Sequence, residues 1–199
     1  MLNSNLFERY LELLLKWNKT YNLTAITDLK EIQIKHFEDS LSPLPFLKSC
    51  ERILDIGTGG GFPGIPLKIE RPELEVILLD SQRKKISFCE EVIRQLGLKK
   101  ISAHQGRAED PKMIKTLGLF NAVICRATFS IHDFLTMAGP YLKKEGIAIA
   151  MKSEHWREEY KEDPRWKLKK IFNYELQNAE GKRSLLIFQS LRASQPVAD

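Results

Sequence analysis

The sequence lacks long apolar runs and paired cysteines, and each absence excludes a class of protein. No run approaches the roughly 20 apolar residues that a membrane-spanning helix needs. The N-terminal segment carries charged residues among its leucines, which is atypical of a signal peptide. The three cysteines, at positions 50, 89 and 125, lie far apart and without the CxxC spacing of a metal site. We therefore expect a cytoplasmic protein with no membrane contact, no disulfide framework and no metal centre.

Positive charge is unevenly distributed along the chain. The formal net charge is +5, whereas the segment from 83 to 126 alone has ten Lys or Arg residues against four Asp or Glu. Two interpretations stay open for this basic segment: solvated helix faces, or a surface that binds a polyanion such as RNA.

The first 48 residues predict a helical extension. Apolar residues recur at helical spacing over 6–17, and turn-forming residues follow over 18–24. A capping box at Asp28 and Glu31 then opens a second helix over 29–41, which prolines at 43 and 45 end.

From 49 to 192 the sequence alternates between strand and helix signals, which predicts βαβ units and a parallel sheet. The expected strands are 52–56, 75–80, 100–104, 120–125, 146–151, 168–176 and 184–190, and the expected helices are 64–70, 82–96, 111–117 and 131–142. A polar, helical piece is expected over 154–160. The short link at 178–181 makes the last two strands an antiparallel hairpin, and the tail over 193–199 is expected to be frayed.

Three carboxylates follow the first three expected strands. Asp55 and Asp80 end apolar runs, and Glu109 comes shortly after the third strand. Because parallel strands end at one edge of a sheet, where open α/β sheets bind ligands, we expect the three acids to meet there. Each has a plainer alternative: Asp80 could cap the next helix, and Glu109 could be a solvated loop acid.

A glycine-rich loop, Gly57–Gly64, follows Asp55 directly. Five glycines in eight residues allow a ligand to lie against the backbone. The loop formally matches the dinucleotide pattern GxGxxG. However, an acidic rim would repel a pyrophosphate, whereas it suits the sulfonium, the ammonium and the ribose hydroxyls of S-adenosylmethionine, with Asp80 as the hydroxyl acceptor.

Six blocks of sequence stand in order between about residues 10 and 190. They are WNKTYNLT at 17–24, HFEDS at 36–40, the loop at 57–66, LDS at 79–81, RA at 126–127 and GKR at 181–183. This order resembles that of the RsmG family, also called glucose-inhibited division protein B, within the class I S-adenosylmethionine-dependent methyltransferases.

The resemblance implies a Rossmann-like methyltransferase domain over 49–192, with a mostly parallel seven-stranded sheet and the helical extension packed on its core. It also implies methylation of guanine N7 in the 530 loop of bacterial 16S ribosomal RNA. Lys152 and Arg183 would lie on the RNA side with Arg126, as the candidate catalytic residues. The expected S-adenosylmethionine site comprises Asp55, Gly57, Thr58, Gly59, Gly61, Phe62, Asp80, Ser81, Ala108, Glu109 and Arg126.

The expected chemistry needs little acid–base machinery. Guanine N7 has a lone pair and no proton, so its methylation requires alignment rather than a general base. Arg126 could bind guanine O6, a phosphate or the cofactor carboxylate, or form an ordinary salt bridge. Cys125 could attack a pyrimidine C6, but a free cysteine on a strand is usually a small buried residue, and the RsmG family commonly has serine there.

Two other functions stay open at this point: an NAD(P)-dependent oxidoreductase and a non-catalytic RNA-binding module. The expected partner is 16S ribosomal RNA, as naked RNA, a 30S subunit or an assembly intermediate, and the protein is expected to be a monomer. The roles of Asn18, Asn22 and His36 stay undecided. His36 and Asp39 share one face of the second helix, where a core or capping role is the usual one for a histidine.

Overall fold

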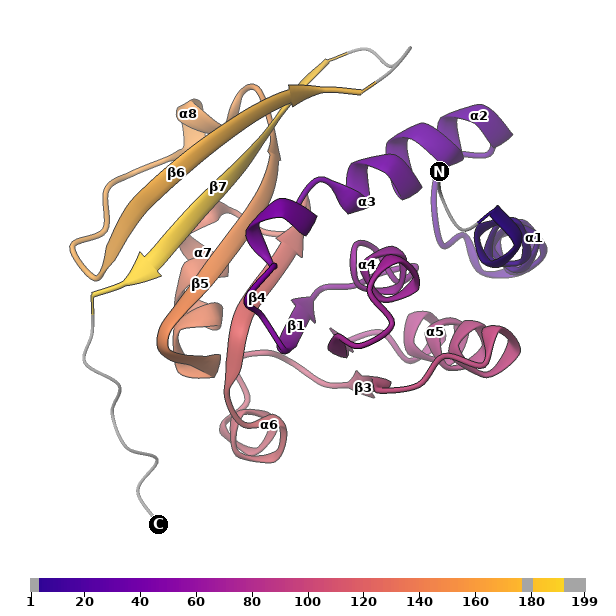
Figure 1. Cartoon of the computed structure of the whole chain (residues 1–199), viewed down its shortest axis with the longest axis horizontal. Helices are drawn as coiled ribbons and strands as arrows, with labels where there is room; N and C mark the ends of the chain where they lie inside the picture. Colours follow the sequence, from indigo (N-terminus) through magenta and orange to yellow (C-terminus); the bar gives the residue numbers. More distant parts are fainter. Residues whose placement is uncertain (1–3, 177–180, 192–199) are drawn as a thin grey trace.

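The computed structural model describes residues 4–176 and 181–191, which form a sheet with helices on both faces (Figure 1). Seven strands lie in the order β3-β2-β1-β4-β5-β7-β6 within the described residues. They are β1 (Arg52–Ile56), β2 (Glu75–Asp80), β3 (Ile101–Gln105), β4 (Phe120–Arg126), β5 (Leu142–Ser153), β6 (Trp166–Glu175) and β7 (Lys182–Ser190). The first five pair in parallel, and β7 is antiparallel to both β5 and β6. The predicted mostly parallel α/β sheet with a C-terminal hairpin is therefore confirmed, although most of the hairpin link lies outside the described residues.

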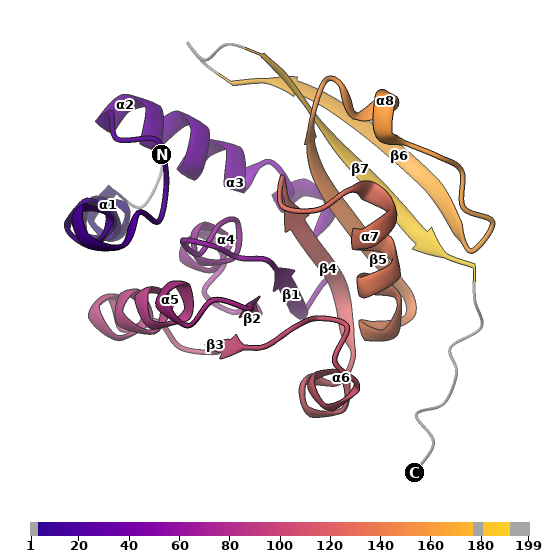
Figure 2. The same cartoon turned by 180° about the vertical axis from the view of Figure 1, so that it is seen from behind.

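The helices form two layers, one on each face of the sheet (Figure 2). One layer contains α1 (Ser4–Tyr21), α2 (Leu29–Ile32), a π-helical segment (Gln33–Glu38), α3 (Asp39–Leu41), η2 (Leu44–Phe46), α4 (Gly64–Glu70) and α5 (Arg83–Leu96). The other contains α6 (Pro111–Leu117), α7 (Ile131–Ala138), η3 (Gly139–Tyr141) and α8 (Trp156–Glu159). No helix in the described ranges is both long and apolar enough to cross a bilayer.

Local sequence explains most of these elements. The central strands β1 and β2 are buried along almost their whole length, as expected for parallel strands covered on both faces. Helix α5 ends at Gly97, whose φ of +64° suits a glycine C-cap. Asp110 caps α6 and Ser130 caps α7, each through a side-chain bond to a backbone N–H of the first turn.

Several predicted boundaries differ from the structure. Helix α1 continues to Tyr21, into the segment predicted as a turn, and the polar piece at 154–160 forms only the single turn of α8. The helix predicted over 131–142 ends at Ala138 and gives way to a 3-10 turn, because Pro140 has no backbone N–H to continue it. Strand β5 then begins at Leu142, four residues earlier than predicted.

The N-terminal extension shares the hydrophobic core on its side of the sheet. Tyr10, Leu14 and Phe37 are almost fully buried in the same cluster as the strand residues Ile53 and Leu78. The extension therefore packs on the sheet without a separate core of its own. The boundary between 48 and 49 stays a prediction, and residues 193–199 lie outside the described part of the chain.

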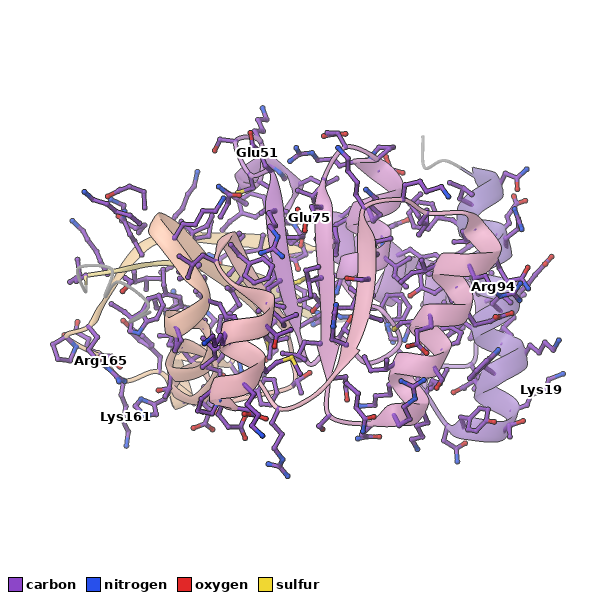
Figure 3. The ribbon with its side chains drawn as sticks, turned by 90° about the horizontal axis from the view of Figure 1, so that it is seen from below. Lys19, Glu51, Glu75, Arg94, Lys161 and Arg165 are labelled. Carbon is purple, nitrogen blue, oxygen red and sulfur yellow. The ribbon has the colours of Figure 1, made fainter. Side chains whose placement is uncertain are left out.

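Charged side chains surround the molecule, with Glu51 and Glu75 labelled near the middle of Figure 3. Figure 3 shows Lys19 and Arg94 on the side of α1 and α5, and Lys161 and Arg165 on the opposite side, next to the hairpin. In the basic segment over 83–126, five of the ten cations form ion pairs with acids. Part of the charge excess is thus neutralised locally, and its role in binding RNA stays a prediction.

Candidate functional site

The carboxyl ends of the parallel strands gather most of the predicted site residues at one edge of the sheet. Asp55 lies near the end of β1, Asp80 ends β2, Arg126 ends β4 and Lys152 lies near the end of β5. Arg183 joins them because β7 is antiparallel and begins at this edge. The crossovers from β1 change direction here, with β2 on one side and β4 on the other, which is the usual place for a ligand.

The glycine loop leaves space for a ligand beside its backbone. Gly57 and Gly59 both have positive φ, +72° and +58°. A Cβ added at Gly57 would lie 2.9 Å from the Phe129 ring, so this position is closed to other residues. A Cβ added at Gly59 would meet no described atom nearer than 3.9 Å. The loop is therefore tight at its start and open at Gly59.

Asp55 is a buried carboxylate with one oxygen bonded and one free. Its Oδ2 accepts hydrogen bonds from the Thr58 hydroxyl at 2.7 Å and the Gly64 N–H at 2.9 Å. Its Oδ1 is buried and finds no partner among the described residues. Burial raises the pKa of Asp55 to about 6, against the lowering effect of these two bonds. Asp55 therefore fixes the glycine loop through Oδ2, while Oδ1 is a buried acceptor without a partner among the described residues.

Asp80 bonds the backbone of the glycine loop and of the turn before α5, and its role toward a ribose stays a prediction. Its Oδ1 accepts the Gln82 N–H at 2.9 Å, one residue before α5 begins, and α5 itself has no side-chain N-cap bond. Its Oδ2 accepts the Gly59 N–H at 3.0 Å and lies 3.6 Å from the Lys85 ammonium. Each carboxylate oxygen has a second lone pair, so Asp80 can hold the glycine loop and still accept a ligand hydroxyl. Ser81 follows it and is exposed.

After β3, the chain places a buried residue, Ala108, and an exposed acid, Glu109, at this edge. Ala108 is 5% exposed, and its carbonyl accepts a hydrogen bond from the Tyr141 hydroxyl at 2.9 Å. The Glu109 side chain is 58% exposed and lies 3.4 Å from Arg107. A contact of either residue with a cofactor stays a prediction.

Phe62 lies inside the cluster that joins the glycine loop to the N-terminal extension. The ring is 5% exposed and stacks on Tyr10 and His36, with centroids 5.4 and 4.6 Å apart. The Tyr10 hydroxyl also donates to the Gly60 carbonyl. The Phe62 ring therefore packs the glycine loop against the N-terminal extension.

Arg126 is held by the N-terminal extension. Its Nη1 donates to the Lys35 carbonyl at 2.8 Å and to Asp39 Oδ2 at 3.3 Å. Its Nη2 lies 3.1 Å from His36 Nδ1, and its Cζ lies 5.0 Å from the centroid of the Phe62 ring. The salt bridge considered from sequence is thus present, and it is buried, with side-chain exposures of 15% and 8% for Arg126 and Asp39.

Lys152 and Arg183 differ in how far they are engaged. The Lys152 ammonium pairs with Glu159 of α8 at 2.7 Å and donates to the Phe129 carbonyl. Arg183 forms only a bond to the Lys182 carbonyl among the described residues, at 3.3 Å. A hollow of about 660 Å³ opens beside β6, β7 and α8 at the same edge, and it is lined by Lys182 and Ser184, the chain neighbours of Arg183. Arg183 therefore has the more available side chain of the two.

Cys125 has the properties of a packing residue. It is 1% exposed, and burial raises the pKa of its thiol to about 11. A thiol that stays protonated at neutral pH is a poor nucleophile. Within residues 4–176 and 181–191, no three His, Cys, Asp or Glu side chains gather to hold a metal ion.

Sequence reasoning assigned no role to the groups that hold Arg126. His36 and Asp39 were recognised as neighbours on one helix face, but their partner on β4 was not. Tyr174, whose hydroxyl donates to Asp39 Oδ1 at 2.7 Å, carried no signal. The HFEDS block itself is the available hint, since it places two polar side chains on an otherwise core-facing helix.

The sheet order, the glycine loop and the acids at the carboxyl edge define a class I methyltransferase domain. Solved structures with this fold include ribosomal protein L11 methylase from Lactobacillus delbrueckii subsp. bulgaricus, with a TM-score of 0.57 and 14% identity over 78% of each chain. Another is coclaurine N-methyltransferase bound to N-methylheliamine and SAH, with a TM-score of 0.54 and 16% identity over 75% of this chain and 45% of that one. At these identities the likeness shows the fold alone.

The chain belongs to the GidB family, rRNA small subunit methyltransferase G, whose model matches residues 3–186. Relatives named ribosomal RNA small subunit methyltransferase G occur in Thermoanaerobacter sp. (strain X514), 46% identical over 80% of this chain and 68% of the relative. The relative from Hydrogenovibrio crunogenus is 42% identical over 89% of this chain and 81% of its own length. The resemblance stated from sequence is confirmed, and neither the oxidoreductase nor the non-catalytic RNA-binding module is supported.

Proposed function

We propose that the protein transfers a methyl group from S-adenosylmethionine to N7 of a guanine in the 530 loop of 16S ribosomal RNA. Membership of the rRNA small subunit methyltransferase G family carries the proposal. The open space beside Gly59 and the Asp80 carboxylate that accepts its N–H support a ligand with hydroxyl or cationic groups at the cofactor position. The coclaurine N-methyltransferase neighbour, which shares the fold, is bound to the demethylated cofactor SAH.

One group of residues at this edge would bind the cofactor, and another would bind the guanine. The glycine loop, Asp55 and Asp80 would hold the cofactor, with Thr58, Gly61 and Phe62 shaping the loop and Ser81, Ala108 and Glu109 completing the site on the β3 side. When bound, S-adenosylmethionine supplies an electrophilic methyl group on a sulfonium. The N7 lone pair forms the new C–N bond while the S–C bond breaks, and the positive charge passes from sulfur to the guanine ring.

Arg126, Lys152 and Arg183 would contact the guanine or its phosphates on the side of β4, β5 and β7. No proton leaves N7 during the transfer, so these residues need only orient the base and stabilise charge. We further propose that the protein acts in the cytoplasm as a monomer, on naked 16S RNA, a 30S subunit or an assembly intermediate. The basic segment over 83–126 would add phosphate contacts.

Transfer to RNA can be tested directly. Purified protein is incubated with methyl-tritiated cofactor and, separately, with naked 16S RNA and with 30S subunits from a strain that lacks the gene. Nucleosides are then analysed by mass spectrometry for 7-methylguanosine. Label in that nucleoside is the expected result, and the better of the two substrates identifies the natural one. Label absent from both, or present only in another nucleoside, contradicts the proposal.

Cofactor choice is tested by calorimetry with S-adenosylmethionine and NAD side by side. Only the first should release or absorb heat on binding. Heat from NAD alone would restore the oxidoreductase alternative.

A further inference from the structure

His36 connects the loop after α1 to the arginine of the proposed site. Its Nε2 lies 2.8 Å from the Thr24 hydroxyl, and its Nδ1 lies 3.1 Å from Arg126 Nη2. The residue is 8% exposed, and its ring stacks on Phe62. Both ring nitrogens are therefore engaged, on opposite sides of the ring.

The identity of the partners fixes which ring nitrogen carries the proton. An arginine guanidinium only donates hydrogen bonds, so His36 Nδ1 must accept. The proton of the neutral ring then resides on Nε2, which donates to the Thr24 hydroxyl. Burial and the neighbouring Arg126 lower the pKa of His36 to about 3, so the ring is neutral at physiological pH.

The Thr24 hydroxyl is itself held in place. It accepts the Ile26 N–H at 3.1 Å. The Asn18 side chain fixes the Thr24 backbone with two bonds of 2.9 Å, one to the carbonyl and one from the N–H. The acceptor of the His36 proton thus belongs to a rigid turn.

The π-helical segment frees a backbone acceptor for the same arginine. In an α-helix the Asp39 N–H would bond the Lys35 carbonyl, four residues earlier. Here it bonds the carbonyls of Ile34 and His36 instead. The Lys35 carbonyl is left to accept from Arg126 Nη1 at 2.8 Å. Such π-turns are frequent at functional sites.

We propose that His36 is a positioning residue, which orients the Arg126 guanidinium for methyl transfer through its Nδ1 acceptor while the Thr24 hydroxyl anchors the Nε2 side of the ring. This inference rests on the proposed function. Three of the five guanidinium N–H donors are used by Lys35, Asp39 and His36. The remaining two serve the cofactor or the guanine.

Two substitutions at His36 separate the role of each nitrogen. The amide of His36→Asn ends at the same bond distance from the backbone as Nδ1, so its oxygen can still accept from Arg126. The amide of His36→Gln ends at the distance of Nε2, so it can still reach Thr24 but leaves Arg126 without this acceptor. Steady-state kinetics on the full-length protein with the better RNA substrate measures both.

We expect His36→Gln to lower kcat by about tenfold to a hundredfold, because small displacements of an aligning group cost rates of this size. His36→Asn should stay within about threefold of the natural protein. The KM for RNA should change little in either variant, since phosphate contacts elsewhere set RNA binding. His132→Gln, at an exposed histidine of α7, is the matched control and should change neither parameter.

A double-variant cycle distinguishes positioning from general support of the fold. If His36 acts through Arg126, His36→Gln should add no further loss of kcat in an Arg126→Lys background. Melting temperatures and cofactor calorimetry accompany each variant. If His36→Gln does not fold, Thr24→Val replaces it, since this variant removes the hydroxyl that anchors the Nε2 side of the ring and should lower kcat by at least about threefold through misalignment of Arg126.

The failures are distinguishable. Equal kcat for the natural protein, His36→Asn and His36→Gln, or equal losses in both variants, would overturn the positioning role of Nδ1. Additive losses in the double variant would also overturn it. Absence of transfer by the natural protein would instead overturn the proposed function.

Discussion

The two ends of the carboxyl edge each contain a buried carboxylate, and they differ in how many of its oxygens are hydrogen-bonded. At the cofactor end, comprising β1 and the glycine loop, Asp55 has two donors on one oxygen and none on the other. At the arginine end, comprising the ends of β4 and of the second helix, Asp39 has both oxygens bonded, one by Tyr174 and one by Arg126. A carboxylate with both oxygens bonded stabilises its surroundings, whereas an unpaired buried oxygen costs stability. Under the proposed function, Asp39 should therefore matter mainly for stability and Asp55 mainly for cofactor binding.

The largest expected effect concerns Arg126 of the arginine end. Arg126→Ala should lower methyl transfer by at least about a hundredfold, the usual effect of losing one charged donor at a reacting centre. It should also lower the free energy of unfolding by about 3–5 kcal/mol, because Asp39 loses the cation of a buried ion pair. Transfer assays and urea denaturation measure the two effects. Near-normal activity would remove Arg126 from the site.

A matched pair of Asp→Asn variants probes the contrast directly. Asp55→Asn should lower S-adenosylmethionine affinity by about tenfold to a hundredfold, the loss expected for a hydrogen bond to a charged group. Its unfolding free energy should hold or rise at neutral pH, since burial no longer opposes a charge. Asp39→Asn should lower the unfolding free energy by about 1–3 kcal/mol. Calorimetry and denaturation measure these, and a stability loss only in Asp55→Asn would reverse the assignment of the two ends.

Two glycines with similar backbone angles separate strain from ligand binding. Gly59 and Gly97 have φ values of +58° and +64°, and each has open space around an added Cβ. Gly59→Ala and Gly97→Ala should therefore each cost about 1–2 kcal/mol of stability through left-handed strain. Only Gly59→Ala should also weaken cofactor binding, by about tenfold, since its methyl group occupies the ligand space. Equal affinities in calorimetry would place the cofactor elsewhere.

The smallest expected effect is a pH dependence of stability, to which His36 and Asp55 contribute in opposite directions. The pKa of His36 is lowered to about 3 by burial and Arg126, so its contribution is complete above pH 6.5 and is lost as pH falls toward 3. The pKa of Asp55 is raised to about 6 by burial, so its contribution is complete below pH 3.8 and is lost as pH rises through 6. Each slope is at most about 1.4 kcal/mol per pH unit.

The opposing slopes should leave the natural protein nearly flat between pH 4 and 6 as far as these groups are concerned. His36→Asn removes one slope, so its stability relative to the natural protein should rise as pH falls through this window. Urea denaturation at pH 4.5, 5.5, 6.5 and 7.5 measures the difference. Parallel curves for the two proteins would contradict the lowered pKa.

The sequence was sufficient to predict the sheet and the positions of the site residues along it. Apolar runs ending in Asp55 and Asp80 located β1 and β2, because strand burial and the carboxyl-edge rule depend on local sequence. Partners across the fold were less accessible. The bonds of Arg126 to Lys35 and His36 join residues about 90 positions apart, and the π-turn that permits one of them has no simple sequence signal.

Tyr174 gives the arginine end a link to the last hairpin. Its hydroxyl joins Asp39, from the beginning of the chain, to β6, 135 residues later. Contacts between such distant segments form late, since the intervening chain must first be closed into a loop. Arg126 therefore acquires its full set of supports only after the N-terminal extension and the last hairpin have both packed against the sheet. A local opening of β6 would release the Asp39 carboxylate from Tyr174 and so loosen the ion pair of Arg126 from a distance.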